Sequence, residues 1–194
     1  IMANKDAPFG LRPVGELGSE VQNSGTTQYR IASGYGTAIY KGDLVILVNA
    51  TGTLNVAGNG DTDLVGVFNG CFYNDPTTQK PTWKNYYPGS ISPSVGNIDA
   101  FVYDDPNKLF EIQAEGSLTY AAAVGKNIDT QYTAGATING QSKVELQDES
   151  PTAATKQLRI IGPSQDPENS DLSSANSNWI VRINESVYQR AAGV

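Results

Sequence analysis

The sequence predicts an all-β fold: a compact barrel or sandwich of short antiparallel strands, with one short helix and an extended N-terminal arm. Short apolar runs separated by turn residues recur along the 194 residues, which is typical of barrels and sandwiches. The chain contains 20 glycines and 10 tyrosines. Glycine suits tight turns and tyrosine fits half-buried strands. Only one segment has the composition of a helix.

The arm is predicted for residues 1–25, ahead of a β domain at residues 26–194. Two prolines in the first 13 residues remove amide donors and favour extended backbone over helix or central strand. In a solvated tail, the apolar side chains between and after these prolines would stay in water and add no stability. We expect the arm to dock on a neighbouring subunit, or alternatively on its own barrel; a frayed terminus is the remaining alternative. The predicted partner contacts are Phe9, Leu11, Arg12 and Val14.

The strands follow in order. Strand-like segments occur at residues 28–31, 43–48, 53–56, 64–73, 98–103, 109–114, 143–147, 157–161 and 179–183. Residues 49–52 (Asn-Ala-Thr-Gly) and 104–108 (Asp-Asp-Pro-Asn-Lys) are turn sequences, so each predicts a hairpin. Alternation of side chains along a strand should place Phe101 with Tyr103 on one face, and Phe110 with Ile112 on one face.

The remaining segments are a helix and two loops. Residues 117–124 contain good helix formers between Ser117, a candidate N-cap, and Gly125, a candidate C-terminal glycine. A loop beginning at residue 74 should hold Trp83. Residues 162–178 are polar and predict a long exposed loop.

Charge excludes several functions. The net charge is −7 and the few basic residues are scattered, so the chain lacks the basic clusters that bind DNA or RNA. The longest apolar runs are far shorter than the roughly 20 residues of a membrane span. Only 17% of residues are charged. A surface poor in charge suits contact with another protein, because charged groups are costly to desolvate.

The residue types also argue against an enzyme. The chain has no histidine, which excludes imidazole catalysis and imidazole metal ligands. Residues 59–63 loosely resemble an oxygen-rich calcium loop but lack its spacing, so they predict a turn. Cys71 is the only cysteine and is expected to be buried and inert. We therefore predict no catalytic residue, no cofactor and no metal. Three acidic pairs leave a glycosidase as a remote alternative: Asp61/Asp63, Asp104/Asp105 and Asp148/Glu149.

Four segments carry a resemblance to a known family. They are MANKDAPFGLRPV (2–14), IASGYGTAIYKGD (31–43), VGVFNGC (65–71) and VYDDPN (102–107). They resemble a group of small virion structural proteins from tailed bacteriophages of aquatic bacteria. The resemblance implies a place in the virion, after assembly in the host cytoplasm.

Within such a particle we expect a decoration or cement subunit that stabilises the head shell. A major capsid subunit normally has more residues and a long helix, whereas decoration subunits are small β domains with an extended arm. Residues 41–47 and 64–68 are similar to strand pairs of lambda-type decoration proteins.

The expected partners are the major capsid protein and further copies of the chain, as a homotrimer on the capsid surface. No direct contact with nucleic acid or membrane is expected. A tail-tube or other virion structural subunit is the alternative. A carbohydrate-binding or glycan-degrading module is the outside alternative.

Overall fold

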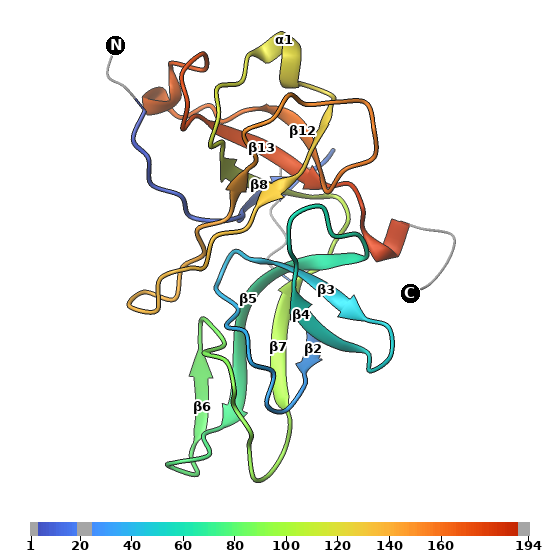
Figure 1. Ribbon diagram of the computed structural model, residues 1–194, viewed down its shortest axis with the longest axis vertical. Helices are drawn as coiled ribbons and strands as arrows, with labels where there is room; N and C mark the ends of the chain where they lie inside the picture. The colour runs from blue at the N-terminus through green and yellow to red at the C-terminus, as the bar shows by residue number, and fades with distance from the viewer. Residues whose placement is uncertain (1–3, 19–24, 190–194) are drawn as a thin grey trace.

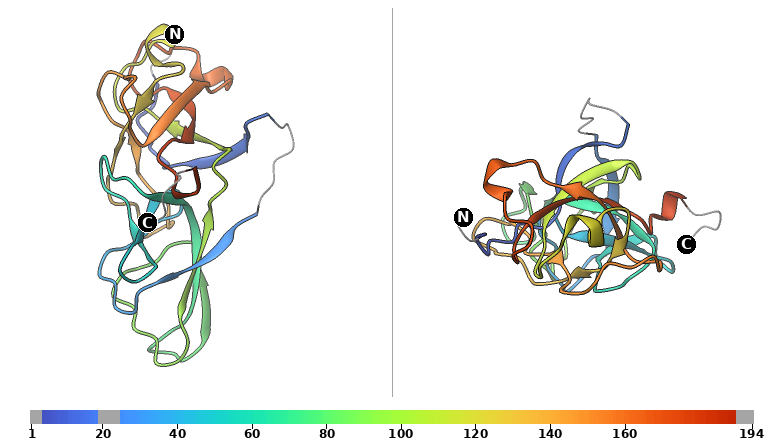
Figure 2. Two further views of the ribbon diagram at one scale, coloured as in Figure 1. Left: turned by 90° about the vertical axis from the view of Figure 1, so that its right-hand side faces the viewer. Right: turned by 90° about the horizontal axis from the view of Figure 1, so that it is seen from above.

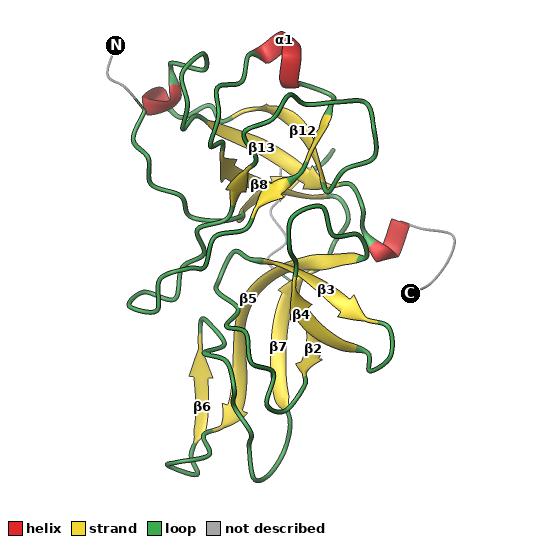
Figure 3. Cartoon of the chain, viewed as in Figure 1, coloured by secondary structure: helices red, strands yellow, loops and turns green. Residues whose placement is uncertain are grey.

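Strands dominate the protein. The structure, a computed structural model, describes residues 4–18 and 25–189. Figures 1 and 3 show two groups of strands that follow one another along the longest axis, and Figure 2 shows the same arrangement from the side. The prediction of an all-β fold is confirmed.

The first group is a closed barrel with one added strand. Its members are β2 (Thr27–Ile31), β3 (Leu44–Val48), β4 (Thr53–Val56), β5 (Leu64–Asn74), β6 (Pro81–Lys84) and β7 (Ile98–Tyr103). Their order is β3-β4-β2-β7-β5-β6, and β3 also pairs with β5. Five strands therefore close into a barrel, and β6 lies outside the ring, paired with β5. Only the β2–β4 pair in this group is parallel.

The second group is an open antiparallel sheet in the order β1-β8-β13-β12-β9. Its strands are β1 (Arg12–Glu16), β8 (Lys108–Gln113), β9 (Asn127–Ile128), β12 (Leu158–Pro163) and β13 (Asn178–Ile183). The smaller elements are β10 (Thr130–Gln131), β11 (Glu145–Leu146), helix α1 (Tyr120–Ala123) and the 3-10 helices η1 (Pro167–Asn169) and η2 (Val187–Gln189).

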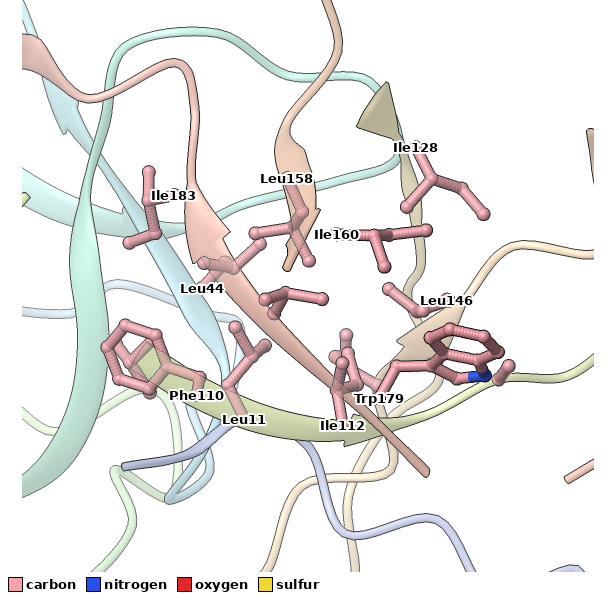
Figure 4. Close-up of a cluster of buried hydrophobic side chains, with 14 of the residues drawn as sticks. Leu11, Leu44, Phe110, Ile112, Ile128, Leu146, Leu158, Ile160, Trp179 and Ile183 are labelled. Carbon is pink, nitrogen blue, oxygen red and sulfur yellow. The ribbon is translucent and has the colours of Figure 1, made fainter. Parts of the chain in front are cut away.

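Two apolar clusters form the core. One fills the barrel around Phe68, Ile98 and Val102. The other lies on the second sheet around Phe110 and Trp179 (Figure 4). It also contains side chains from barrel strands, namely Leu44, Leu64 and Val67. The barrel and the second sheet therefore share this cluster, in which each large buried side chain contributes about 1.5–3 kcal/mol.

Burial along β7 follows the expected alternation, whereas on β8 residues 110–113 are all buried. On β7 the even-numbered residues are buried and the odd-numbered ones, including Phe101 and Tyr103, are half-buried. On β8, Phe110 and Ile112 both belong to the cluster beneath the second sheet. Each predicted pair therefore lies on one face of its strand.

The predicted hairpin at residues 104–108 is wrong. The turn forms, with the Lys108 N–H donating to the carbonyl oxygen of Asp105 over 3.0 Å. However, β7 pairs with β2 and β5 in the barrel, whereas β8 pairs with β1 and β13 in the second sheet. Local residues form the turn, but long-range partners decide which sheet each strand joins.

Of the other two local predictions, the hairpin at residues 49–52 is confirmed and the helix is shorter than expected. The hairpin at residues 49–52 is confirmed, because β3 and β4 pair and the Gly52 N–H donates to the carbonyl oxygen of Val48 over 2.8 Å. The helix is shorter than the predicted 117–124. It spans only Tyr120–Ala123, with Thr119 in place of Ser117 at the N-cap. Gly125 follows with φ of +80°, the left-handed conformation of a C-terminal glycine.

Candidate interaction surfaces

The N-terminal segment, defined here as residues 4–11, lies against its own chain. Asn4 Nδ2 donates to the carbonyl oxygens of Asp171 (2.9 Å) and Ala175 (3.0 Å). Gln113 Oε1 accepts from the Ala7 N–H at 2.9 Å, and Gln113 Nε2 donates to the Lys5 carbonyl at 3.0 Å. These bonds attach the segment to β8 and to the loop after η1; residues 1–3 and 19–24 of the predicted arm lie outside the described residues.

Leu11 is part of the protein's own core. Its side chain is 2% exposed and joins the cluster shown in Figure 4, near Leu44 and Phe110. Gly10, with φ of +72°, makes this close approach possible, because a Cβ there would lie 2.4 Å from Ser142 Cβ. The expectation that a neighbouring subunit buries Leu11 is wrong. The alternative, docking on the chain's own β domain, is what the structure shows for this residue.

The other predicted contact residues lie at the surface. The Arg12 guanidinium pairs with the Glu111 carboxylate and lies 4.9 Å from the centre of the half-buried Phe9 ring. Val14 is 40% exposed, at a point where the β1–β8 register shifts. The structure thus brings Phe9 and Arg12 together and directs Leu11 inward. Val14 is left on the outside.

A second surface was missed from the sequence. The outer aromatic face, as we call it, consists of Phe72 on β5, Trp83 on β6 and Phe101 on β7. Trp83 is 52% exposed and Phe72 is 40% exposed. They are opposite each other in the β5–β6 register, and the Trp83 ring lies 5.2 Å from the Phe101 ring. Three aromatic rings from three adjacent strands therefore gather on the outside of the barrel.

A glycine positions the tryptophan. A Cβ on Gly70 would lie 2.6 Å from Trp83 Cζ2 and 2.9 Å from the Lys84 carbonyl oxygen. Gly70 is also opposite Phe101 in the β5–β7 register. The absence of a side chain at Gly70 lets the indole lie close to β5 and reach Phe101. The prediction of a loop around Trp83 is wrong, because β6 includes this residue. The Pro-Thr-Trp-Lys sequence after a turn was the signal that could have revealed the strand.

Several ionisable groups are buried or half-buried in the fold. Asp43 is buried, its Oδ2 accepts from the Tyr40 N–H at 2.8 Å, and burial raises its pKa to about 6. Burial also raises the pKa of Glu145 to about 7, with support from the negative charges of Asp6 and Glu115. Lys156 Nζ lies between Asp129 (2.9 Å) and Glu149 (2.7 Å).

The predicted turn at residues 59–63 has a structural role. Asp61 Oδ2 accepts from the Gly58 N–H at 2.7 Å, and Asn59 bonds to Gln131 and to the Tyr132 N–H. Within residues 4–18 and 25–189, no group of three or more acidic or cysteine side chains could hold a metal ion. No helix in the same part of the chain is long and apolar enough to cross a membrane.

Cys71 is buried, as predicted. Its Sγ lies 3.5 Å from the carbonyl oxygen of Tyr86, to which the thiol donates. Burial raises the pKa of the thiol to about 12. At neutral pH the reactive thiolate is therefore scarce.

Comparisons with known proteins give no relative: no protein-family model, curated protein or solved structure matches the chain. Function therefore has to be inferred from the chain's own residues. Two surfaces stand out: the outer aromatic face, which exposes Trp83 and Phe72, and the N-terminal segment with β1, which places Arg12 and Val14 on the outside.

Proposed function

We propose that the chain is a decoration subunit of a phage head, which binds the outside of the shell through protein contacts. Two observations support the proposal. The first is the resemblance of residues 2–14, 31–43, 65–71 and 102–107 to small virion structural proteins. The second is the outer aromatic face, which is the surface that we expect to contact the shell.

Exposed aromatic rings suit a protein-binding role. Trp83 and Phe72 are both exposed and lie opposite each other on adjacent strands, and clustered exposed rings are typical of interaction sites. Tryptophan is also among the residues that contribute most to protein–protein affinity. The same cross-strand row continues from Phe72 to Asp99 and then to Arg30. This acidic–basic pair flanks the rings and can orient a partner.

The N-terminal residues have a smaller part in this proposal than the sequence predicted. Leu11 is buried in its own core and is unavailable to a partner. Val14 and Arg12 remain at the surface as secondary contacts. Attachment is therefore expected to depend mainly on the aromatic rings. Because these contacts are apolar, moderate salt should weaken them little.

Binding to shells tests the proposal. Purified chain is mixed with phage heads that lack it, and the bound fraction is measured after sedimentation. The chain should bind, and Trp83→Ala should weaken binding by about 2 kcal/mol or more, the usual effect of removing a dominant tryptophan. Tyr120→Ala is the matched control, because Tyr120 is also exposed but lies on α1, outside the outer aromatic face. Circular dichroism confirms that both variants are folded.

Two results would contradict the proposal. Unchanged binding of Trp83→Ala would remove the outer aromatic face from the contact. Sedimentation with isolated tail tubes but not with heads would favour the tail-tube alternative. A separate experiment tests the expected homotrimer. Sedimentation equilibrium should give a mass three times the 20.6 kDa of one chain.

A further inference from the structure

A pocket of about 380 Å³ opens where the N-terminal segment and the start of β1 meet the end of β7. Residues 9 and 11–13 line one part of it. The rest of the lining comes from Lys41 in the turn before β3, Tyr103 at the end of β7 and Gln141 in the loop before β11. We call it the basic pocket, because both charged residues in this lining, Arg12 and Lys41, are basic.

Hydrogen bonds hold the walls of the basic pocket in place. Gln141 Nε2 donates to the carbonyl oxygens of Phe9 (2.6 Å) and Lys41 (3.2 Å). The Lys41 N–H donates to the Gly140 carbonyl oxygen at 3.0 Å, and the Lys41 carbonyl oxygen accepts from the Ser142 N–H at 2.9 Å. Three separate parts of the chain are joined by these bonds, so the pocket is formed in advance of any ligand.

Part of the lining is apolar. Phe9 and Tyr103 contribute half-buried aromatic rings, and Leu11, which is 2% exposed, belongs to the core behind them. An apolar ring or chain that entered the pocket would leave water, which is favourable. The volume lies within the usual 300–1,000 Å³ of small-molecule sites. The pocket therefore has room and apolar surface for a small organic molecule.

Arg12 can still donate hydrogen bonds to such a molecule. Its Nε, at 3.1 Å, and its Nη2 both donate to Oε2 of Glu111, whose carboxylate offsets the guanidinium charge. Arginine has five N–H donors, so donors remain beyond the two in these bonds. The Arg12 side chain is 60% exposed, which leaves these donors accessible from solvent.

Lys41 supplies the net charge of the pocket. Its side chain is exposed, and its ammonium group forms no ion pair with any residue in 4–18 or 25–189. One uncompensated positive charge favours an anion with a single negative charge. A carboxylate has that charge and accepts hydrogen bonds from both ammonium and guanidinium groups, whereas a phosphate monoester carries about two charges.

We propose that the basic pocket binds a small monocarboxylic acid that carries an apolar ring or chain. The carboxylate lies at Lys41 and Arg12, and the apolar part packs against Phe9 and Tyr103. The outer aromatic face shares no residue with this pocket. Failure of the acid to bind would therefore leave the proposed attachment to the shell untouched.

Nuclear magnetic resonance titration with three probes tests the site. The ¹⁵N-labelled full chain is titrated separately with benzoate, with benzamide, which has the same shape without the charge, and with acetate, which lacks the ring. Benzoate should give saturable shifts of the backbone signals of Arg12, Lys41 and Gln141. Benzamide should bind about fivefold more weakly, because it loses the ion pair. Acetate should bind at least about tenfold more weakly, because it buries no ring.

Lys41→Gln should weaken benzoate binding about three- to fivefold, the effect of losing one accessible ion pair. The variant should stay folded, because the Lys41 hydrogen bonds to Gly140, Gln141 and Ser142 use backbone atoms of Lys41. Lys80→Gln is the matched control, since Lys80 is an exposed lysine between β5 and β6, outside the pocket. It should bind benzoate as wild type does.

Any of four results would overturn the proposal. Benzoate might give no saturable shift, or benzamide might bind as tightly as benzoate. Binding might be unchanged in Lys41→Gln, which would place the carboxylate elsewhere. Equal weakening in Lys41→Gln and Lys80→Gln would mean that benzoate responds only to the overall charge of the chain.

Discussion

The backbone N–H of Leu11 donates to the carbonyl oxygen of Gly42 over 2.9 Å. This bond joins the N-terminal segment to the turn that precedes β3, and Ser142 packs against the same point. Three parts of the chain that are distant in sequence therefore meet at Gly10, Gly42 and Ser142. Because the contact is so close, it should be sensitive to a single added methyl group.

Gly10→Ala should destabilise the protein strongly. The new Cβ would lie 2.4 Å from Ser142 Cβ and 2.7 Å from the Gly42 carbonyl oxygen, in addition to the strain of φ at +72°. We expect a loss of about 3 kcal/mol or more in the free energy of unfolding, measured in urea. Gly125→Ala is the control, because Gly125 has φ of +80° and nothing within 4 Å of the added Cβ. It should lose only about 1–2 kcal/mol. Equal losses would show that the close packing at Gly10 is absent.

Leu11→Ala should cost about 2–5 kcal/mol, the range for emptying a leucine site in a core. Val14→Ala should change the free energy of unfolding by only about 0.5 kcal/mol, because Val14 is 40% exposed. The comparison separates a segment built into the fold from a free arm. If both variants were as stable as wild type, Leu11 would be available to a partner.

Asp43 should make stability depend on pH. Burial raises its pKa from 3.8 to about 6, so the folded chain binds this proton more tightly than the unfolded chain does. The resulting stabilisation is fully present below pH 3.8 and is lost as the pH rises through about 6. Asp43→Asn cannot titrate and keeps an acceptor for the Tyr40 N–H.

The measurement is the free energy of unfolding of wild type minus that of Asp43→Asn, at several pH values. This difference should fall by about 2–3 kcal/mol across the window, as a shift of this size implies. A difference that is independent of pH would mean that Asp43 is ionised as easily in the folded chain as in water.

Cys71 should be nearly inert in the folded protein. The pKa of its thiol is raised from 9.0 to about 12, and the side chain is buried. The scarcity of thiolate alone slows reaction with DTNB on the order of 1,000-fold. Reaction should become fast in guanidinium chloride. Rapid reaction under native conditions would place the thiol at the surface.

Local patterns predicted most elements but not their partners. The β3–β4 hairpin was predictable, because its turn residues and both strands lie within the 13 residues from Leu44 to Val56. The turn after β7 was equally clear, yet β7 and β8 part into different sheets, a choice made by β1, β2, β5 and β13. Such pairings depend on residues nearly 100 positions apart, as between Arg12 and Glu111.

The surfaces were harder to predict than the fold. Apolar residues between prolines suggested a partner for Leu11, but the sequence did not reveal that Gly10 lets Leu11 pack beside Gly42 and Ser142. The outer aromatic face depends on the register that brings Trp83 opposite Phe72 and over Gly70. A polar pocket is lined jointly by residues 4–9, Gln113 and residues 166–178. None of these arrangements has a signature in neighbouring residues.

Electron cryomicroscopy of phage particles tests the proposed function most directly. The barrel and the second sheet should fit density on the outer surface of the head. Trp83 and Phe72 should face the major capsid protein, and no density from this chain should contact the packaged DNA. Density for the chain in stacked rings along the tail, or inside the head against DNA, would contradict the proposal.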